Sequence, residues 1–409
     1  MTRENNDPAI VFIVLNLRMG GQVTAINALI TLLKQKGVEA TLLLPHGVAS
    51  ADKTALDAYV TLPFWVRLKE TWHLLRNISL KMQRPDTVLH LVLPSPAFSW
   101  LVWLVDFPQE RILIQYEGAV TRWDQAHRQA LWDDPGMLAP RMIINHYCWS
   151  LAGRWLTASH LAIGSHAATA LKSLGYDKVS TAANLALFAP EDHAPQLELP
   201  VDFDNETITL VGYIGHCFAV KGVDDLLAAF ARAANQANHL RLLLALSGDG
   251  NATRIRKAIQ HFHIGDKVAI LGLVPTQRLL ERLDVLVLPY RAALTTTLYP
   301  SLLLEADSVG CPVITTAIPE WQNILTPPPP HVTVLPPRDV PALAQALMKV
   351  TRRNGQCYGS FLHLPPQEER LEHMRTIYRN LSGMVEMGMV TERLSDTTTP
   401  GQGIRTPQS

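Results

Sequence analysis

The sequence has few cysteines and no long apolar run, and each absence excludes a class of protein. Its four cysteines (Cys148, Cys217, Cys311 and Cys357) form no CxxC pair, so neither a disulfide framework nor a cysteine zinc site is expected. No apolar run reaches the ~18 residues that a membrane-spanning helix needs. The first apolar run, residues 10–15, is too short for a signal peptide. We therefore expect a cytoplasmic protein with reduced thiols.

An excess of charge is also missing. Lysine plus arginine and aspartate plus glutamate are equal, at 36 each, so nothing favours binding to nucleic acid. No His/Cys/Asp cluster has the spacing of metal ligands. The DxD sequence at Asp202–Asp204 lies in a segment without periodicity, not at a strand end with other ligands. We expect neither a metal nor a cofactor.

What the chain does contain is a repeated alternation of apolar β-runs with helix-length segments. This alternation is typical of α/β domains with parallel sheets buried on both faces. The length of 409 residues allows two or three domains. The predicted architecture is two Rossmann-like, doubly wound parallel-sheet domains facing a central cleft. The expected divisions are an N-terminal domain (1–190), a linker (191–206), a C-terminal domain (207–362), C-terminal helices (363–391) and a disordered tail (392–409).

The most informative stretch is residues 285–319, which reads as strand, loop, helix, tight turn and strand. The β-run Val285–Leu288 precedes a threonine-rich loop, and a helix carrying Glu305 follows. Gly310 occupies the position after this helix where a left-handed residue is usual. Because ligands bind at the carboxyl ends of parallel strands, the free N–H groups of the helix start are placed for an anionic ligand. Glu305, in the second turn, is placed to bind hydroxyls of the same ligand.

A second candidate element is the turn between the predicted strand 208–215 and the next helix. Lys221 lies in this turn, directly before Gly222 and the helix start. A mobile ammonium at a strand's carboxyl end suits a diphosphate, whose negative charge grows when it leaves a sugar. A solvated turn without a binding role is the alternative reading of the same residues.

Together these stretches resemble family 4 of the retaining glycosyltransferases, which have the GT-B fold. The resemblance rests on Glu305-Ala306, on Gly310-Cys311-Pro312-Val313 and on Lys221-Gly222. It implies that Lys221 contacts the donor diphosphate and that Glu305 holds ribose hydroxyls. Two positions depart from the family pattern: Thr297 replaces its first glutamate, and His216 replaces its arginine. Histidine donates a hydrogen bond but lacks the bidentate contact of arginine.

The resemblance assigns further donor contacts to backbone groups. Glycine turns match the family at three places: Gly20 and Gly21, Gly248 and Gly250, and Gly272 with Val274. Two residues of the 289–300 loop, Leu298 and Tyr299, fall near the phosphates or sugar. Glu117 ends a buried strand where many members have a histidine, so it is the candidate polar group near the transferred sugar. Purely structural turns, and a capping carboxylate at Glu117, are the alternatives.

The function implied is transfer of a sugar from a nucleotide diphosphate sugar to a glycan, lipid or other acceptor, without metal. No Ser-His-Asp set or paired carboxylates are needed, because the departing phosphate itself deprotonates the acceptor in this family. Two alternatives stay open. The departures at Thr297 and His216 are compatible with a catalytically silent subunit that binds a partner or glycan. A sugar-nucleotide epimerase of the same fold is the weaker alternative.

Residues 64–82 form one further candidate surface. The segment is amphipathic, with Trp65, Leu68, Trp72 and Leu75 near one face, and it has four basic residues against one acid. This pattern is typical of a helix lying on an anionic membrane leaflet. An ordinary helix packed on the first sheet has the same pattern. The expected location is cytoplasmic, and the first of these readings adds peripheral contact at the inner face of the membrane.

Overall fold

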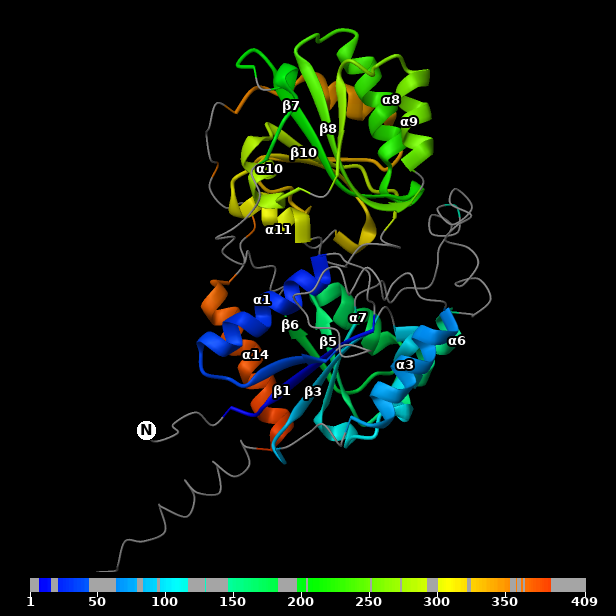
Figure 1. The fold of residues 1–409 in the computed structure, drawn as a ribbon, viewed down its shortest axis with the longest axis vertical. Coiled ribbons are helices and arrows are strands. Elements are labelled where there is room, and N and C mark those ends of the chain that lie inside the picture. The colour runs from blue at the N-terminus through cyan, green and yellow to red at the C-terminus, as the bar shows by residue number, and fades with distance from the viewer. Residues whose placement is uncertain are drawn as a thin grey trace, which may run out of the picture.

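The computed structural model has two α/β domains, one above the other in Figure 1. It describes residues 7–15, 21–43, 64–78, 84–93, 96–116, 129, 146–182, 197–203, 205–250, 252–272, 274–292, 301–321, 325–353, 358, 362 and 365–383. Within these ranges, no helix is both long enough and apolar enough to cross a membrane.

The N-terminal domain is built on a six-stranded parallel sheet in the order β2-β1-β3-β4-β5-β6. Every side chain of the central strand β3 is buried, as expected where helices cover both faces of a parallel sheet. The strands are β1 (Ile10–Val14), β2 (Ala40–Leu43), β3 (Val88–Leu93), β4 (Ile112–Tyr116), β5 (Ser159–Ile163) and β6 (Val179–Ala182).

Two separate apolar clusters fill the two faces of this sheet. One face packs against α1 (Gly21–Gln35) and α14 (Gln367–Ser382). The other face packs against segments that include α3, η3 and α7. The elements on that side are α3 (Phe64–Arg76), η3 (Pro96–Leu104), α6 (His146–Ser150), η6 (Leu151–Trp155) and α7 (Ser165–Ser173). The short turn η4 (Gln109–Arg111) precedes β4 and contacts α14. The predicted helix at 64–82 is therefore present from Phe64 to Arg76; residues 79–82 lie outside the described ranges.

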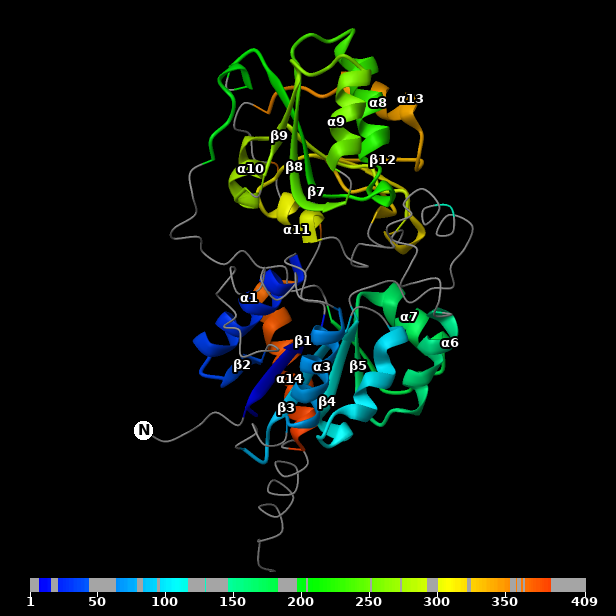
Figure 2. The ribbon, with the colours of Figure 1, turned by 45° about the vertical axis from the view of Figure 1, so that its right-hand side comes forward.

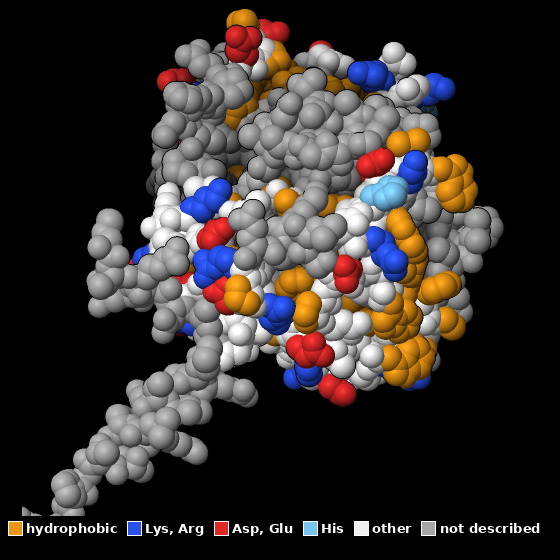
Figure 3. Space-filling view, turned by 60° about the horizontal axis from the view of Figure 1, so that its bottom comes forward, with side chains coloured by type: hydrophobic (Ala, Val, Ile, Leu, Met, Phe, Trp, Pro, Cys, Tyr) orange, Lys and Arg blue, Asp and Glu red, His pale blue; other side chains and the backbone are white. Residues whose placement is uncertain are grey.

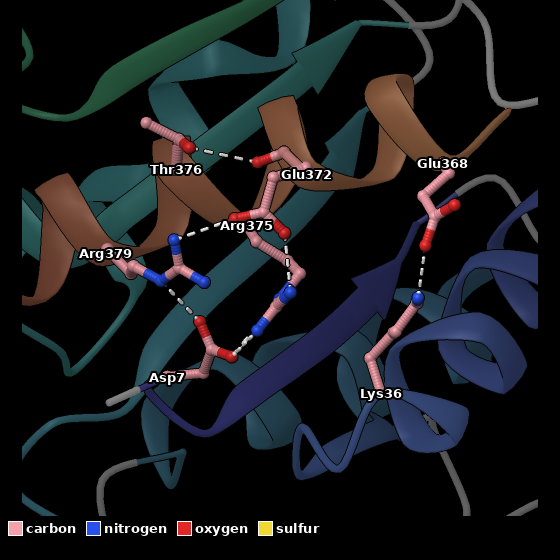
Figure 4. A network of polar contacts seen from close by, with 7 residues as sticks. All are labelled: Asp7, Lys36, Glu368, Glu372, Arg375, Thr376 and Arg379. Atoms are coloured by element: carbon pink, nitrogen blue, oxygen red, sulfur yellow. Dashed lines mark hydrogen bonds and ion pairs between the residues drawn. The ribbon is translucent and has the colours of Figure 1, made fainter. Parts of the chain in front are cut away.

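Helix α14, the last element among the described residues, packs on the N-terminal domain beside α1 (Figures 1 and 2). Its Tyr378 is buried, and the Tyr378 hydroxyl lies 2.8 Å from Nδ1 of His90 in β3. Arg375 and Arg379 both donate to the buried carboxylate of Asp7, at 2.5 and 2.7 Å (Figure 4). The two ends of the described chain are thus tied together by charge-assisted bonds.

The C-terminal domain has a second six-stranded parallel sheet, in the order β12-β11-β10-β7-β8-β9. This is the Rossmann strand order, counted from β7 as the first strand. The strands are β7 (Thr209–Cys217), β8 (Leu240–Gly250), β9 (Val268–Leu271), β10 (Val285–Leu288), β11 (Val313–Thr316) and β12 (Val332–Leu335). The predicted fold of two parallel-sheet α/β domains is confirmed.

Helices and short turns cover this second sheet and join its strands. Asp339 caps α13 by accepting a hydrogen bond from Ala342 N at 2.9 Å, and Gly310 ends α11 with the expected left-handed φ of 59°. The elements are η7 (Val201–Phe203), η8 (Ala219–Lys221), α8 (Val223–Ala234), α9 (Ala252–His261), α10 (Thr276–Arg282), α11 (Ser301–Ser308), η9 (Pro319–Trp321) and α13 (Val340–Met348).

One predicted turn differs from the structure. We expected a glycine turn at Gly248 and Gly250. Instead β8 continues to Gly250, and its last residue is paired with Cys217 of β7. Strand β7 continues to Cys217, so its backbone groups are available to pair with β8. Strand β8 therefore extends beyond its own apolar residues.

Candidate functional site

The strand order of the C-terminal sheet creates a position where ligands bind in α/β folds. The chain runs from β7 outward to β8 and β9, then returns to the other side of β7 as β10. The connections that leave β7 and β10 therefore diverge at their carboxyl ends, which is the topological switch point. Turn η8, which carries Lys221, follows β7, and Pro289 and Tyr290 follow β10.

The backbone holds the Lys221 turn closely against the end of β10. Gly222 has a left-handed φ of 71°, and a Cβ atom added there would lie 1.8 Å from the carbonyl oxygen of Pro289. Glycine is therefore required both by conformation and by space. A hydrogen bond of 2.8 Å from Arg291 N to Val220 O joins the same two segments. This packing fixes where the Lys221 side chain starts.

The Lys221 side chain is buried, with 5% of its surface exposed. Its Nζ lies 4.1 Å from the centroid of the Tyr290 ring, an arrangement in which the ring face attracts the cation. Burial lowers the pKa of Lys221 from 10.5 to about 7, since removing water disfavours the charged form. Among the described residues, no carboxylate forms an ion pair with Lys221.

This burial costs stability over a defined range of pH. In the unfolded chain lysine keeps its proton up to about pH 10.4, whereas in the folded protein it loses the proton near pH 7. Below pH 7 the full cost of holding the buried charge is present, and it diminishes as the pH rises from 7 toward 10.5. A costly buried charge beside a strand end is typical of a functional position.

Tyr290 is the residue around which the rest of the site is arranged. Its ring centroid lies 5.1 Å from that of the buried Trp321, and its carbonyl oxygen accepts a hydrogen bond of 2.5 Å from Thr316. Burial, and secondarily the negative charge of Glu305, raises the pKa of the Tyr290 hydroxyl. Glu305 in α11 and Lys221 in η8 therefore lie near the same ring.

A second contact secures the segment after β10. Arg291 donates two hydrogen bonds to Asp225, at 2.7 and 2.6 Å, and both side chains are largely buried. Asp225 stands in the first turn of α8, where the helix dipole favours a carboxylate. The adjacent Asp224 pairs with Arg254 of α9. The start of α8 is thus fixed on both sides.

His216 lies just before the Lys221 turn, at an irregularity in β7. The pairing with β8 shifts register between Gly215 and Cys217, and such a bulge redirects the side chain that it carries. His216 is half-buried, its ring centroid is 5.8 Å from that of Phe218, and its carbonyl oxygen accepts from Tyr213 at 2.5 Å. The pairing of Cys217 with Gly250 places the end of β8 beside this bulge.

The structure describes some of the other predicted contact residues and not the rest. Gly21 is the first residue of α1, and Gly272 follows β9, two strands away from β7, with open space where a side chain would stand. Val274 is half-buried and packs against the core of the C-terminal domain. Gly20, Glu117, Thr297, Leu298 and Tyr299 lie outside the described residues, so their roles remain predictions.

Two residues of the site were missed from the sequence, Tyr290 and Arg291. Both come directly after the buried strand β10, and the signal that identifies them is this position at the carboxyl end beside β7. In the part of the chain that the structure describes, no group of three His, Cys, Asp or Glu side chains has a geometry that suits a metal ion. The described part of the site is therefore the buried Lys221, the Tyr290 ring that faces it, the nearby Glu305 and the Arg291–Asp225 ion pair.

Residues 206–353 match the model of the family Glycosyl transferases group 1. This domain is a glycosyltransferase group 1 domain. The match includes all six strands of the C-terminal sheet together with Lys221, Tyr290 and Glu305. The prediction of a glycosyltransferase-type enzyme is confirmed at this level. Comparison with curated proteins returned no match.

Solved structures share the architecture of the whole chain. WaaG, a glycosyltransferase involved in lipopolysaccharide biosynthesis, is 13% identical, with a TM-score of 0.55 over 92% of this chain and 99% of its own. Anabaena HepE in complex with UDP and glucose is 12% identical, with a TM-score of 0.56 over 95% and 99%. The lipopolysaccharide outer core galactosyltransferase WaaB is 15% identical, with a TM-score of 0.53 over 92% and 99%. These similarities show that the fold is GT-B.

Proposed function

We propose that the protein is a retaining glycosyltransferase of family 4. It would transfer a hexose-like sugar from a nucleotide diphosphate sugar to a glycan or lipid-linked acceptor. The family match of the C-terminal domain supports the reaction class, and the site geometry supports the donor. The donor's nucleotide, its sugar and the acceptor are left open in this proposal.

The observation that carries the proposal is the buried ammonium of Lys221 at the switch point. It is 5% exposed, it lies 4.1 Å from the centre of an aromatic ring, and no described carboxylate pairs with it. The buried ammonium has lost the stabilisation that surrounding water would give it. An anion that enters the site restores this electrostatic stabilisation. A diphosphate fits this requirement because its charge increases as the bond to the sugar breaks.

The proposed reaction breaks the bond between the sugar's anomeric carbon and the diphosphate oxygen. The acceptor oxygen attacks the same face of the anomeric carbon, and its proton passes to the departing diphosphate. Lys221 stabilises the negative charge on that diphosphate. His216, from the β7 bulge, would donate one further hydrogen bond. No covalent intermediate on the enzyme is required, and neither is a metal.

The proposed donor contacts continue along the 289–305 segment. Glu305, in α11, would accept hydrogen bonds from ribose hydroxyls, and backbone groups at Leu298 and Tyr299 would lie near the phosphates. HepE holds UDP and glucose on the same fold, which supports a nucleotide sugar as ligand. Changing Glu305 to Gln should weaken donor binding about fivefold, because a charge-assisted hydrogen bond is worth roughly twice a neutral one.

The proposal is tested by finding the donor and then measuring its turnover. A panel of nucleotide sugars is screened by thermal shift, and nucleotide release is then followed with acceptor extracts, with and without excess EDTA. We expect one donor to raise Tm and to release its nucleotide equally fast in both conditions. Loss of release in EDTA that added magnesium or manganese restores would overturn the metal-independent mechanism.

The alternative of a catalytically silent subunit is tested through Thr297. A carboxylate at this position in family 4 accepts hydrogen bonds from the donor sugar, whereas threonine offers one short hydroxyl. We propose that Thr297 marks a changed sugar preference. Thr297→Glu should then shift the preference among donors by roughly tenfold, the scale of one ~1.4 kcal/mol contact. If neither protein turns over any donor while both bind a partner protein, the silent subunit is correct.

A further inference from the structure

The N-terminal domain carries an unusual concentration of exposed aromatic side chains. Among the described residues, eight large apolar side chains are exposed, and all but Val201 lie in α3, η3, α6 and η6. Five of these seven are tryptophans. We call the aromatic members the tryptophan surface; they are Trp65, Trp72, Phe98, Trp103, Trp149 and Trp155.

These four elements form one continuous side of the domain. Element η3 contacts α3, α6 and η6, and the ring centroids of Trp100 in η3 and Trp149 in α6 are 5.9 Å apart. Figure 3 shows the apolar side chains gathered along one edge of the domain, on the side where Figure 1 labels α3 and α6. Basic side chains and a histidine lie beside them. The surface is therefore shared by several segments.

Helix α3 separates its apolar residues into two sets with different partners. Leu74 and Leu75 are buried against the sheet, whereas Trp65 and Trp72 are 74% and 45% exposed. The inward leucines belong to the apolar core of the domain, whereas the outward tryptophans leave much of their apolar surface exposed. Tryptophan is the residue that accumulates at membrane–water interfaces, where its ring meets the acyl boundary and its N–H stays hydrated.

The charge of this side fits an anionic lipid surface. The four elements contain four basic residues (Arg67, Lys69, Arg76 and Arg154) and one acid (Glu70), a net of +3 without histidines, in a chain whose overall formal charge is zero. Asp106, which follows η3 and donates its backbone N–H to Leu75 O of α3, is a further acid beside the surface. Arg76 lies over the Trp72 ring, and Arg154 over the Trp155 ring. Arginine beside tryptophan is the pairing that binds headgroups while the ring enters the interface.

We propose that the tryptophan surface docks the protein on an anionic lipid bilayer. The tryptophans enter the interfacial region, and Lys69, Arg76 and Arg154 contact the negatively charged headgroups. The proposal rests on surface residues of the N-terminal domain and is independent of the function proposed for the C-terminal site.

Co-sedimentation with lipid vesicles tests this proposal. The full-length protein is mixed with vesicles of phosphatidylcholine alone or with roughly one third phosphatidylglycerol, and binding is repeated at about 0.5 M salt, where surface charge is screened. We expect at least tenfold tighter binding to the anionic vesicles and a clear loss at high salt. Brominated lipids should quench the tryptophan fluorescence of the bound protein.

Two double variants assign the binding to this surface. Lys69→Gln with Arg76→Gln should weaken binding roughly thirtyfold, since each basic residue near an anionic surface contributes about 1 kcal/mol. Trp65→Ser with Trp72→Ser should weaken it at least tenfold and remove part of the quenching. Matched controls in other regions are Arg256→Gln with Lys257→Gln on the exposed side of α9, and Val201→Ser. Both controls should bind as the wild type does.

Melting temperatures within a few degrees of the wild type confirm that each variant is folded, as is expected for exposed positions. Equal binding to both kinds of vesicle, no binding to either, or variants within threefold of the wild type would overturn the proposal. If ultracentrifugation instead shows a dimer that Trp65→Ser with Trp72→Ser dissociates, without vesicle binding, the surface is an interface between two copies.

Discussion

The C-terminal domain buries a cation against an aromatic ring, whereas the N-terminal domain exposes pairs of the same kind. Lys221 and Tyr290 are 5% and 3% exposed. Trp72 and Trp155, which carry Arg76 and Arg154 over their rings, are 45% and 62% exposed. The two kinds of pair differ in the hydration of the cation, because the exposed guanidinium groups keep their water while the buried ammonium loses it. Only the buried pair therefore holds a charge that a ligand has to stabilise.

This comparison separates two ways of binding an anion. An enclosed cation suits a small ligand that displaces no competing water and fills one defined place. Exposed cations spread beside tryptophans suit an extended, fluid surface with many equivalent charges. The same pairing of residues therefore supports a donor diphosphate in one domain and lipid headgroups in the other.

The largest effect should come from removing the buried cation. Lys221→Ala is expected to reduce turnover by about a hundredfold or more, because a lost contact to a developing charge costs ~3 kcal/mol. Turnover and melting temperature are measured together, and the exposed Lys257→Ala is the control. Activity within threefold of the wild type, in a folded variant, would refute the assignment of Lys221.

The second-largest effect should come from removing the Tyr290 ring that lies against Lys221. Tyr290→Ala is expected to weaken donor affinity roughly thirtyfold, since a desolvated cation–π contact is worth about 2 kcal/mol. Tyr290→Phe retains the ring face and should bind within about twofold of the wild type. Calorimetric titration of the three proteins distinguishes the cases. Equal losses in both variants would show that the hydroxyl matters and the ring does not.

The pKa of the buried lysine predicts a smaller effect with a definite sign. Burial lowers the pKa of Lys221 to about 7 in the empty site, and a bound diphosphate favours the charged form. Donor affinity should therefore be about tenfold weaker at pH 8 than at pH 6, with about one proton taken up on binding at pH 8. Calorimetry in two buffers of different ionisation enthalpy measures this uptake. Lys221→Met should show no uptake.

The exposed pairs should matter least for folding and turnover. Trp72→Ser removes an exposed cation–π contact worth about 0.5–1 kcal/mol, so thermal unfolding should shift by only a few degrees. Turnover with soluble donor and acceptor should stay within twofold. A hundredfold loss of turnover would place Trp72 in the donor or acceptor site and would remove the contrast between the two domains.

Local features of the C-terminal domain could be predicted from the sequence. The β10 run is apolar throughout because both faces of a central parallel strand are covered, and Gly310 follows α11 because a left-handed residue ends the helix there. The position of Lys221 just before a helix could also be predicted from the local sequence pattern. The burial of Lys221 against Tyr290 could not be predicted, because that contact joins two turns about 70 residues apart and depends on β7 and β10 being neighbours.

The N-terminal domain was harder to predict, because its informative features depend on three-dimensional packing. Periodicity showed that residues 64–82 are amphipathic, but it placed Trp65, Trp72 and Leu75 on one face. In the structure Leu75 is fully buried, while both tryptophans are exposed. Which apolar residues face the sheet depends on the angle at which the helix packs, and η3, α6 and η6 complete the exposed set from distant parts of the sequence.

The position of α14 has a consequence for how the protein is made. One face of the N-terminal sheet is covered by α1 and by this helix, whose Arg375 and Arg379 contact Asp7 and whose Tyr378 contacts His90. The ribosome delivers Gln367–Ser382 only after the C-terminal sheet has been synthesised. The domain translated first therefore has only α1 on that face until α14 is made, whereas the domain translated second by then has all its strands. A nonsense mutation just before residue 367 would spare the later domain and leave the earlier one incomplete.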